Sequence, residues 1–118
     1  MLSREAILKA NDLPSEEVAV PEWGGSVLVV TLTGEERDSF EQSIIETKGK
    51  NARVNMANAR AKLVALSCRA GDGERLFDDT DIAALGRKSS KALDRVYGVA
   101  ARLSGISGED IEELAKNS

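Results

Sequence analysis

One stretch constrains the fold more than any other, residues 51–69 with the sequence NARVNMANARAKLVALSCR. Its apolar side chains recur at helical spacing in two adjoining stripes, Val54, Ala57, Ala61, Val64 and Cys68 in one and Met56, Ala59, Leu63 and Leu66 in the other. Alanine, leucine, arginine, lysine and methionine are good helix formers, so local propensity agrees with this pattern. Asn51 can cap the first turn. A face this wide predicts a central helix that other elements contact on more than one side.

The segments before this helix predict a short helix followed by a β-hairpin. Ser3 can cap a helix over residues 3–10, which is too short to be stable alone and must dock on a partner or, more simply, on the rest of the domain. Residues 16–32 place β-branched side chains on both sides of Gly24-Gly25, a pair that tolerates the positive φ angles of tight hairpin turns. Pro21 cannot donate a ladder hydrogen bond, so the first strand is expected at a sheet edge or bent.

The rest of the chain predicts further helices. Thr33-Gly-Glu-Glu36 is a capping box that can start a helix, and Gly49 is a natural stop. The expected helices cover about 34–48, 51–69, 80–86, 90–104 and 108–116. A chain of 118 residues has the size of one domain. Together these elements predict an α+β fold, a mostly helical single domain over residues 1–118 with one N-terminal β-hairpin packed on a helical bundle.

The residue types of common enzyme chemistry are scarce in this sequence. It has no histidine, the commonest general base and metal ligand, and its one cysteine, Cys68, has no partner for a disulfide or a zinc site. A calcium loop counted from Asp79 needs a glycine and an acid where Ala84 and Ser90 stand, so the aspartates at 78–81 are interpreted as helix caps. We therefore expect no enzyme, no cofactor and no catalytic, cofactor-binding or metal-binding residue.

The segment at 87–95 supports a second interpretation. Residues 81–96, DIAALGRKSSKALDRV, predict a helix, a turn with a glycine and another helix, with Arg87, Lys88, Lys91 and Arg95 around the second helix start. A small DNA-binding helix-turn-helix regulator places such residues on phosphates and base edges. An ordinary helical hairpin with solvated basic side chains has the same pattern. The formal net charge of −4 repels nucleic acid, so no nucleic-acid partner is expected.

Six segments in order along the chain carry a resemblance to a known family. They are VPEWGG at 20–25, LTGEER at 32–37 continuing to Phe40, ARAKLVALS at 59–67, LFDDTDIAAL at 76–85, ALDRV at 92–96 and ARLSG at 101–105. This series resembles the tail assembly chaperones of long-tailed, siphophage-type bacteriophages. None of the segments is a catalytic signature, so their order is what makes the resemblance specific.

The resemblance implies a non-enzymatic protein that binds and solubilises the tape measure protein and helps to recruit the major tail tube protein during tail morphogenesis. It also implies a place in the cytoplasm of the bacterial host during infection, absence from the mature virion, and self-association to a homo-oligomer as one expected state. No membrane partner is expected, because no apolar run approaches the ~20 residues of a membrane-spanning helix.

Three residues are candidates for contact with a protein partner. Trp23 is the lone tryptophan and lies at the predicted turn, where it either folds back over the hairpin or stays exposed for another protein. Ile111 and Leu114 lie in the last predicted helix, where little chain remains to cover them. For all three, ordinary packing within the chain is the alternative.

Overall fold

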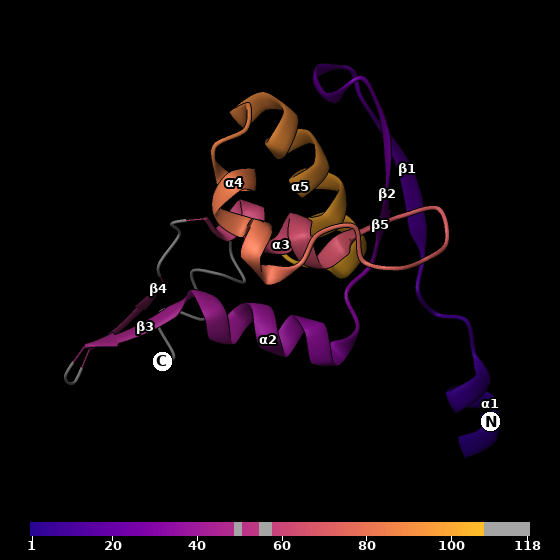
Figure 1. The fold of residues 1–118 in the computed structure, drawn as a ribbon. Coiled ribbons are helices and arrows are strands. Elements are labelled where there is room, and N and C mark those ends of the chain that lie inside the picture. The colour runs from indigo at the N-terminus through magenta and orange to yellow at the C-terminus, as the bar shows by residue number, and fades with distance from the viewer. Residues whose placement is uncertain (49–50, 55–57, 108–118) are drawn as a thin grey trace.

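The computed structural model describes residues 1–48, 51–54 and 58–107, and it has the predicted α+β architecture (Figure 1). In chain order its elements are α1 (Arg4–Lys9), β1 (Ser15–Val20), η1 (Pro21–Trp23), β2 (Gly25–Val30), α2 (Gly34–Ile44), β3 (Ile45–Lys48), β4 (Asn51–Val54), α3 (Ala59–Ser67), β5 (Cys68–Arg69), η2 (Asp79–Asp81), α4 (Ile82–Gly86) and α5 (Ser90–Ser104). The predicted helix at 108–116 lies outside the described residues.

The predicted β-hairpin is confirmed, and it belongs to a three-stranded antiparallel sheet in the order β1-β2-β5. Ser15 pairs with Val30 at one end and Val20 pairs with Gly25 at the other, where Gly24 has the positive φ of 77° that the turn requires. Strand β1, which ends directly before Pro21, lies at the edge of the sheet, as expected. The short third strand, β5, was not predicted, because residues 68–69 continue the helical pattern of the preceding segment.

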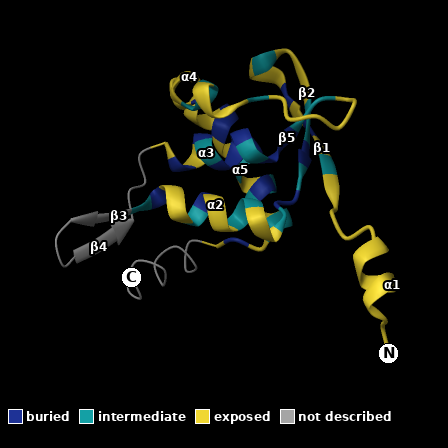
Figure 2. Cartoon of the chain, turned by 60° about the horizontal axis from the view of Figure 1, so that its bottom comes forward, coloured by how far each residue is buried: buried dark blue, intermediate teal, exposed yellow. Residues whose placement is uncertain are grey.

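Helix α3 is the centre of the fold, as its wide apolar face predicted. It contacts α2, α4 and α5, so that side chains on several sides of this short helix are buried (Figure 2). The buried members are Ala59, Ala61, Leu63, Val64, Ala65 and Ser67. Around them the core gathers residues from the sheet and from the other helices, namely Val18, Val20, Val29, Leu32, Phe40, Ile44, Cys68, Leu85, Ala92, Leu93, Val96, Ala100 and Ile106.

The two helices expected at 34–48 and 51–69 are shorter than predicted at the ends that face each other along the chain. The helix expected at 34–48 ends at Ile44, and the one expected at 51–69 begins at Ala59 and ends at Ser67, with Asn51 in a strand rather than at a helix cap. Strands β3 and β4 pair antiparallel between them, from Ile45 opposite Val54 to Lys48 opposite Asn51. The residues at 45, 47 and 54 are β-branched and favour strands, a preference that the helical spacing of the alanines concealed.

Other predicted helix boundaries are accurate because side chains fix them. Thr33 and Glu36 form both hydrogen bonds of the capping box at α2, with N···O distances of 3.1 and 3.0 Å. Helix α5 spans 90–104 as predicted, and Gly105 caps its end with a φ of 68°. The 80–86 prediction corresponds to η2 and α4 in succession, which end at Gly86.

The N-terminal helix forms as predicted but does not dock on the domain. Ser3 caps α1 by accepting a hydrogen bond from the Ala6 amide at 3.1 Å. Figures 1 and 2 show α1 projecting beyond the sheet, and none of residues 1–15 is buried. The expectation that this helix packs on the rest of the domain is therefore wrong.

Candidate functional site

Two ion pairs hold the β1–β2 hairpin along α5. Near the turn, the two terminal guanidinium nitrogens of Arg95, Nη1 and Nη2, contact the Glu22 carboxylate, with Nη2 3.1 Å from Oε2. At the other end, Arg102 Nη2 lies 2.8 and 2.9 Å from the two oxygens of Glu16. The two arginines are two helical turns apart and therefore share one face of α5. The guanidinium of Arg95 also lowers the pKa of Glu22, so this carboxylate stays ionised in the folded chain.

The segment between β2 and α2 closes onto the end of α5. The Leu32 amide donates to the Ser104 hydroxyl at 2.9 Å, and the Thr31 hydroxyl donates to the Leu103 carbonyl at 2.9 Å. These bonds satisfy polar groups at the helix C-terminus that lack partners within the helix. Together, these hydrogen bonds and the two ion pairs hold one face of the β1–β2 hairpin against α5 along the length of the helix.

A second junction joins α2 to β5 through Glu36 and Arg69. Arg69 Nη2 lies 2.9 Å from Glu36 Oε2, and both side chains are largely covered. Partial burial opposes ionisation of Glu36, but the hydrogen bond from the Thr33 amide and the Arg69 guanidinium outweigh it and lower the pKa of this carboxyl. The same carboxylate therefore caps a helix and anchors the third strand.

The predicted contact residue Trp23 lies half-buried in a shallow groove beside the hairpin turn. The groove has a volume of about 310 Å³ and is lined by Glu22, Trp23, Phe77, Leu85 and Lys88. Trp23 packs against the edge of the core, yet its indole remains accessible next to Phe77. The geometry thus combines both sequence interpretations of this residue, and its role as an interface residue stays a prediction. Ile111 and Leu114 lie outside the described residues.

The face of the sheet that points away from α5 forms a second groove, which the sequence interpretation missed. Glu17, Leu28 and Arg69 stand opposite one another across the three strands. With the loop after β5 they enclose about 540 Å³, and we call this space the outer-face groove; its apolar lining comes from Val27, Leu28, Ala70 and Leu76. The signal in the sequence was the unbroken apolar run at 27–30, because a strand without alternation has apolar residues on both faces.

A hydrogen-bonded turn holds the loop that borders this groove. The Ala70 amide donates to the Glu74 carbonyl at 2.8 Å, and the Leu76 amide donates to the Cys68 carbonyl at 3.1 Å. Gly73 has a φ of 88°, a conformation that glycine adopts without steric cost. Arg75 Nη2 donates to the Ala65 carbonyl at 3.2 Å, which ties the loop to the end of α3.

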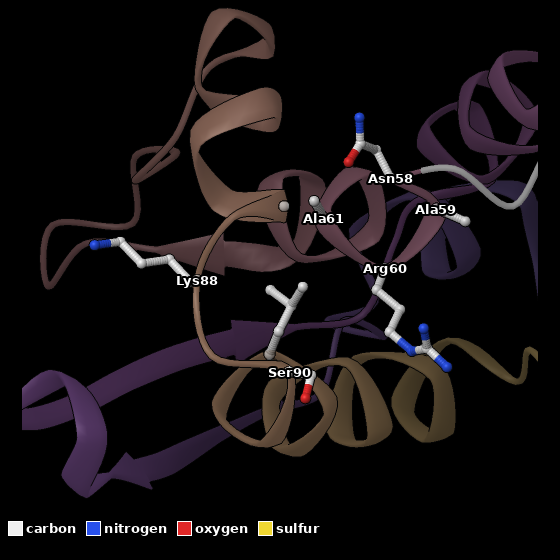
Figure 3. A pocket seen from close by; sticks show the side chains of 8 residues that line it. Asn58, Ala59, Arg60, Ala61, Lys88 and Ser90 are labelled. Atoms are coloured by element: carbon white, nitrogen blue, oxygen red, sulfur yellow. The ribbon is translucent and has the colours of Figure 1, made fainter.

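A third hollow, between α3 and the α4–α5 turn, has the features of a packing notch (Figure 3). Its volume is about 150 Å³. A Cβ at Gly86 would lie 2.3 Å from the side-chain oxygen of Asn58, so the exposed Asn58 side chain would have to move to admit a larger residue there. Figure 3 shows the Arg60 and Lys88 side chains pointing in opposite directions, and Arg60 Nε lies 2.6 Å from an Asp94 oxygen. The basic groups therefore do not converge on a ligand.

The residues considered for chemistry have structural partners. Cys68 is fully buried, and burial raises the pKa of its thiol to about 12, so the thiolate nucleophile is suppressed. Asp78 accepts a hydrogen bond from the Thr80 amide at 2.8 Å, and the Asp81 carboxylate accepts one from the Asp78 amide, which confirms the capping interpretation. Within the described ranges, no group of three or more acidic or cysteine side chains could hold a metal ion.

The basic segment at 87–95 does not present a free recognition surface over its whole length. Arg95 is bound to Glu22, in one of the two ion pairs that hold the hairpin along α5. Helix α4, which would be the first helix of a helix-turn-helix, spans only Ile82–Gly86. Arg87, Lys88 and Lys91 are exposed, as solvated basic residues of an ordinary helical hairpin are. Nothing in this arrangement favours DNA binding over that simpler interpretation.

Comparison with known proteins places the fold. No protein-family model and no curated protein matches the chain. Among solved structures, it is similar to the tail assembly chaperone of bacteriophage HK97, with a TM-score of 0.59 over 84% of this chain and 94% of that chain. The two sequences are 17% identical, so the likeness is one of fold. No helix in the described part of the chain is long and apolar enough to cross a membrane.

Proposed function

We propose that this protein is a bacteriophage tail assembly chaperone, a binding protein without an enzymatic role. The observation that supports this most is the fold shared with the HK97 tail assembly chaperone, which extends over most of both chains. The ordered series of motifs that resembles the same family gives independent support from the sequence. The two apolar grooves also suit a binding protein. An enzyme would need a cleft with convergent polar groups, which none of the described clefts provides, and the buried thiol of Cys68 is inert.

The partner proposed first is the tape measure protein. A long helical rod with apolar stripes aggregates unless those stripes are covered. The Trp23 groove is suited to such a partner, because Trp23 and Phe77 offer aromatic surface between the charged side chains of Glu22 and Lys88. The net charge of −4 would keep a coated rod soluble.

The second partner proposed is the major tail tube protein, which the chaperone would help to bring to the coated rod. Weak contacts repeated along the rod give strong binding through avidity, yet each contact can be displaced as a tube subunit arrives. The work would take place in the host cytoplasm during infection, and the chaperone would leave before the virion is complete.

Co-expression tests the proposal. The chain is produced together with the tape measure protein of the same phage, and the soluble fraction is examined for a complex. We expect the tape measure protein to be soluble only with the chaperone, and the substitution Trp23→Glu to weaken the complex at least tenfold. As a matched control, Gln42→Glu adds the same charge at an exposed position of α2. An insoluble tape measure protein with no complex would refute the proposal.

A further inference from the structure

The basic segment at 87–95 lies beside the Trp23 groove and has no role in the function proposed above. Lys88, in the turn between α4 and α5, lines the groove, and Figure 3 shows its side chain extending away from the hollow beside α3. Lys91 follows in the first turn of α5 and shares a helix face with Arg95, because the two are four residues apart. The groove therefore has a basic margin on the side of α5.

Glu22, the acidic residue in the groove lining, does not cancel this positive charge. The Arg95 guanidinium binds its carboxylate and lowers its pKa, and the nearby charge of Lys91 lowers that pKa further. In the described part of the chain, no ion pair engages Lys88 or Lys91. Three basic side chains thus stand against one carboxylate, and this margin attracts an anionic group.

The opposite charge lies on the Phe77 side of the groove. Asp78 follows Phe77 directly, and Asp79 and Asp81 lie in the short helix η2 after it. A nucleic acid, whose charge is uniformly negative, would be repelled on this side even where the basic margin attracts it. A protein segment can instead place its carboxylates on one flank only. The two-sided charge therefore favours a protein partner.

The remaining lining of the groove suits apolar side chains. Trp23 and Phe77 are partly buried and Leu85 is buried, and accessible aromatic side chains are frequent anchors at protein interfaces. The volume of about 310 Å³ is at the lower end of the range usual for binding pockets, so an occupant inserts side chains. An apolar face with an acidic flank beside it is typical of a helix, because a strand places alternate side chains on opposite faces.

We propose that the Trp23 groove binds an acidic amphipathic helix of a partner protein. The apolar side chains of that helix lie against Trp23 and Phe77, and the carboxylates on one of its flanks face Lys88 and Lys91. The charges fix the orientation of the helix, while the apolar contacts supply most of the affinity. The inference rests on the proposed function in that the same groove binds protein, and it adds the charge of the segment that the groove accepts.

The first test selects ligands for the immobilised native chain from a displayed library of random peptides. We expect the recovered peptides to have apolar residues at helical spacing with glutamate or aspartate on one flank. The variant Lys88→Glu with Lys91→Glu should recover lysine and arginine on that flank instead. The matched control is Arg4→Glu with Lys9→Glu, which changes the charge equally at exposed positions of α1 and should recover acidic peptides.

Three outcomes of this selection would overturn the proposal. They are a native chain that recovers no peptide, recovered peptides without an excess of acidic residues, and acidic peptides recovered equally well by the variant with glutamate at positions 88 and 91.

The second test uses Trp23 as a reporter, because it is the single tryptophan of the sequence. A recovered peptide without tryptophan is titrated into the native chain. We expect the emission to move to shorter wavelengths as the indole is covered, and added salt to weaken binding. Lys88→Gln with Lys91→Gln removes both charges without adding repulsion against Glu22, and it should raise the Kd at least tenfold.

Peptide binding that leaves the Trp23 emission unchanged, or that is equally tight in the glutamine variant, would overturn the proposal. So would a single-stranded DNA oligonucleotide that changes the emission at a lower concentration than the peptide does.

Neither test uses the tape measure protein, so their failure is distinct from failure of the proposed function. A tape measure complex that forms equally well with Lys88→Glu and Lys91→Glu in the chain would overturn the charge preference and leave the proposed function intact. Selection of acidic peptides by a chain that does not bind the tape measure protein would support the charge preference and refute the proposed function.

Discussion

The β1–β2 hairpin and residues 1–14, the N-terminal arm, are adjacent in sequence, yet only the hairpin is held by the rest of the molecule. The hairpin has one face buried on α5, with Val20 and Val29 almost inaccessible, and ion pairs secure both of its ends. The arm has an equally apolar composition but no buried residue. The comparison shows that apolar side chains organise a segment only where an opposing surface and polar anchors exist together.

The largest expected contrast comes from truncating one apolar side chain in each region. Val29→Ala removes two buried methyl groups and should lower the free energy of unfolding by about 2 kcal/mol. Ile7→Ala in the arm should change it by less than about 0.5 kcal/mol. Urea unfolding measures both values. Equal losses would show that the arm is packed after all.

The next effect comes from the polar closure at the end of the hairpin. Ser104→Ala removes the hydroxyl that accepts a hydrogen bond from the Leu32 amide and leaves that amide without this partner. We expect a loss of about 1 kcal/mol in the free energy of unfolding. Asp94 is exposed on the same helix, and Asp94→Ala provides a comparison in which only the surface ion pair with Arg60 is lost. A larger loss for Asp94→Ala would contradict the role of Ser104.

The pH dependence of stability should follow the carboxylates that anchor the fold. The pKa of Glu36 is lowered in the folded chain from an ordinary value of 4.5, and those of Glu22 and Asp78 are lowered as well. Their contribution to stability is therefore fully present above about pH 4.5 and is lost as the pH falls through the lower folded values. Thermal unfolding between pH 7 and pH 3 should show this loss, and Glu36→Gln should make the profile shallower. An unchanged profile in Glu36→Gln would contradict this assignment.

The smallest effects are expected from the two ion pairs along α5. Arg95→Gln should lower the melting temperature more than Arg102→Gln, because the Arg95 and Glu22 side chains are less exposed than the Arg102 and Glu16 side chains. Salt should reduce both effects, since exposed pairs are screened. Thermal unfolding at low and high salt provides the measurement. A larger fall in melting temperature for Arg102→Gln than for Arg95→Gln would contradict the role of the Arg95–Glu22 ion pair near the turn.

Local patterns in the sequence predicted the elements whose limits are set by neighbouring residues. The Thr33 capping box, the Gly24 turn and the Gly105 cap fix backbone conformation within a few residues, so they could be recognised without the fold. Strands β3 and β4 could not, because Ala52 and Arg53 suit a helix as well as a strand, and the pairing of these two neighbouring strands decides between them. A different limit hid β5, because its partner strand residue Leu28 lies far away in sequence.

The candidate site was predictable only in part, for the same reason. Trp23 was identified as a rare aromatic residue at a turn, but its neighbours Phe77 and Leu85 are brought to it by the fold. The outer-face groove combines β1, β2 and a loop that follows β5, so no local spacing reveals it. The free arm was predicted as a helix from its cap and its composition, whereas the absence of a docking surface is a property of the whole fold.

The central proposal assigns this protein to a phage, and removal of its gene from that phage tests the proposal most directly. The coding sequence is disrupted, and lysates are examined by electron microscopy with and without the protein supplied from a plasmid. The account predicts heads without tails in the disrupted phage, insoluble tape measure protein, restoration by the plasmid, and no trace of the protein in purified virions by mass spectrometry. Normal tails formed without the protein, or the protein retained in finished virions, would contradict it.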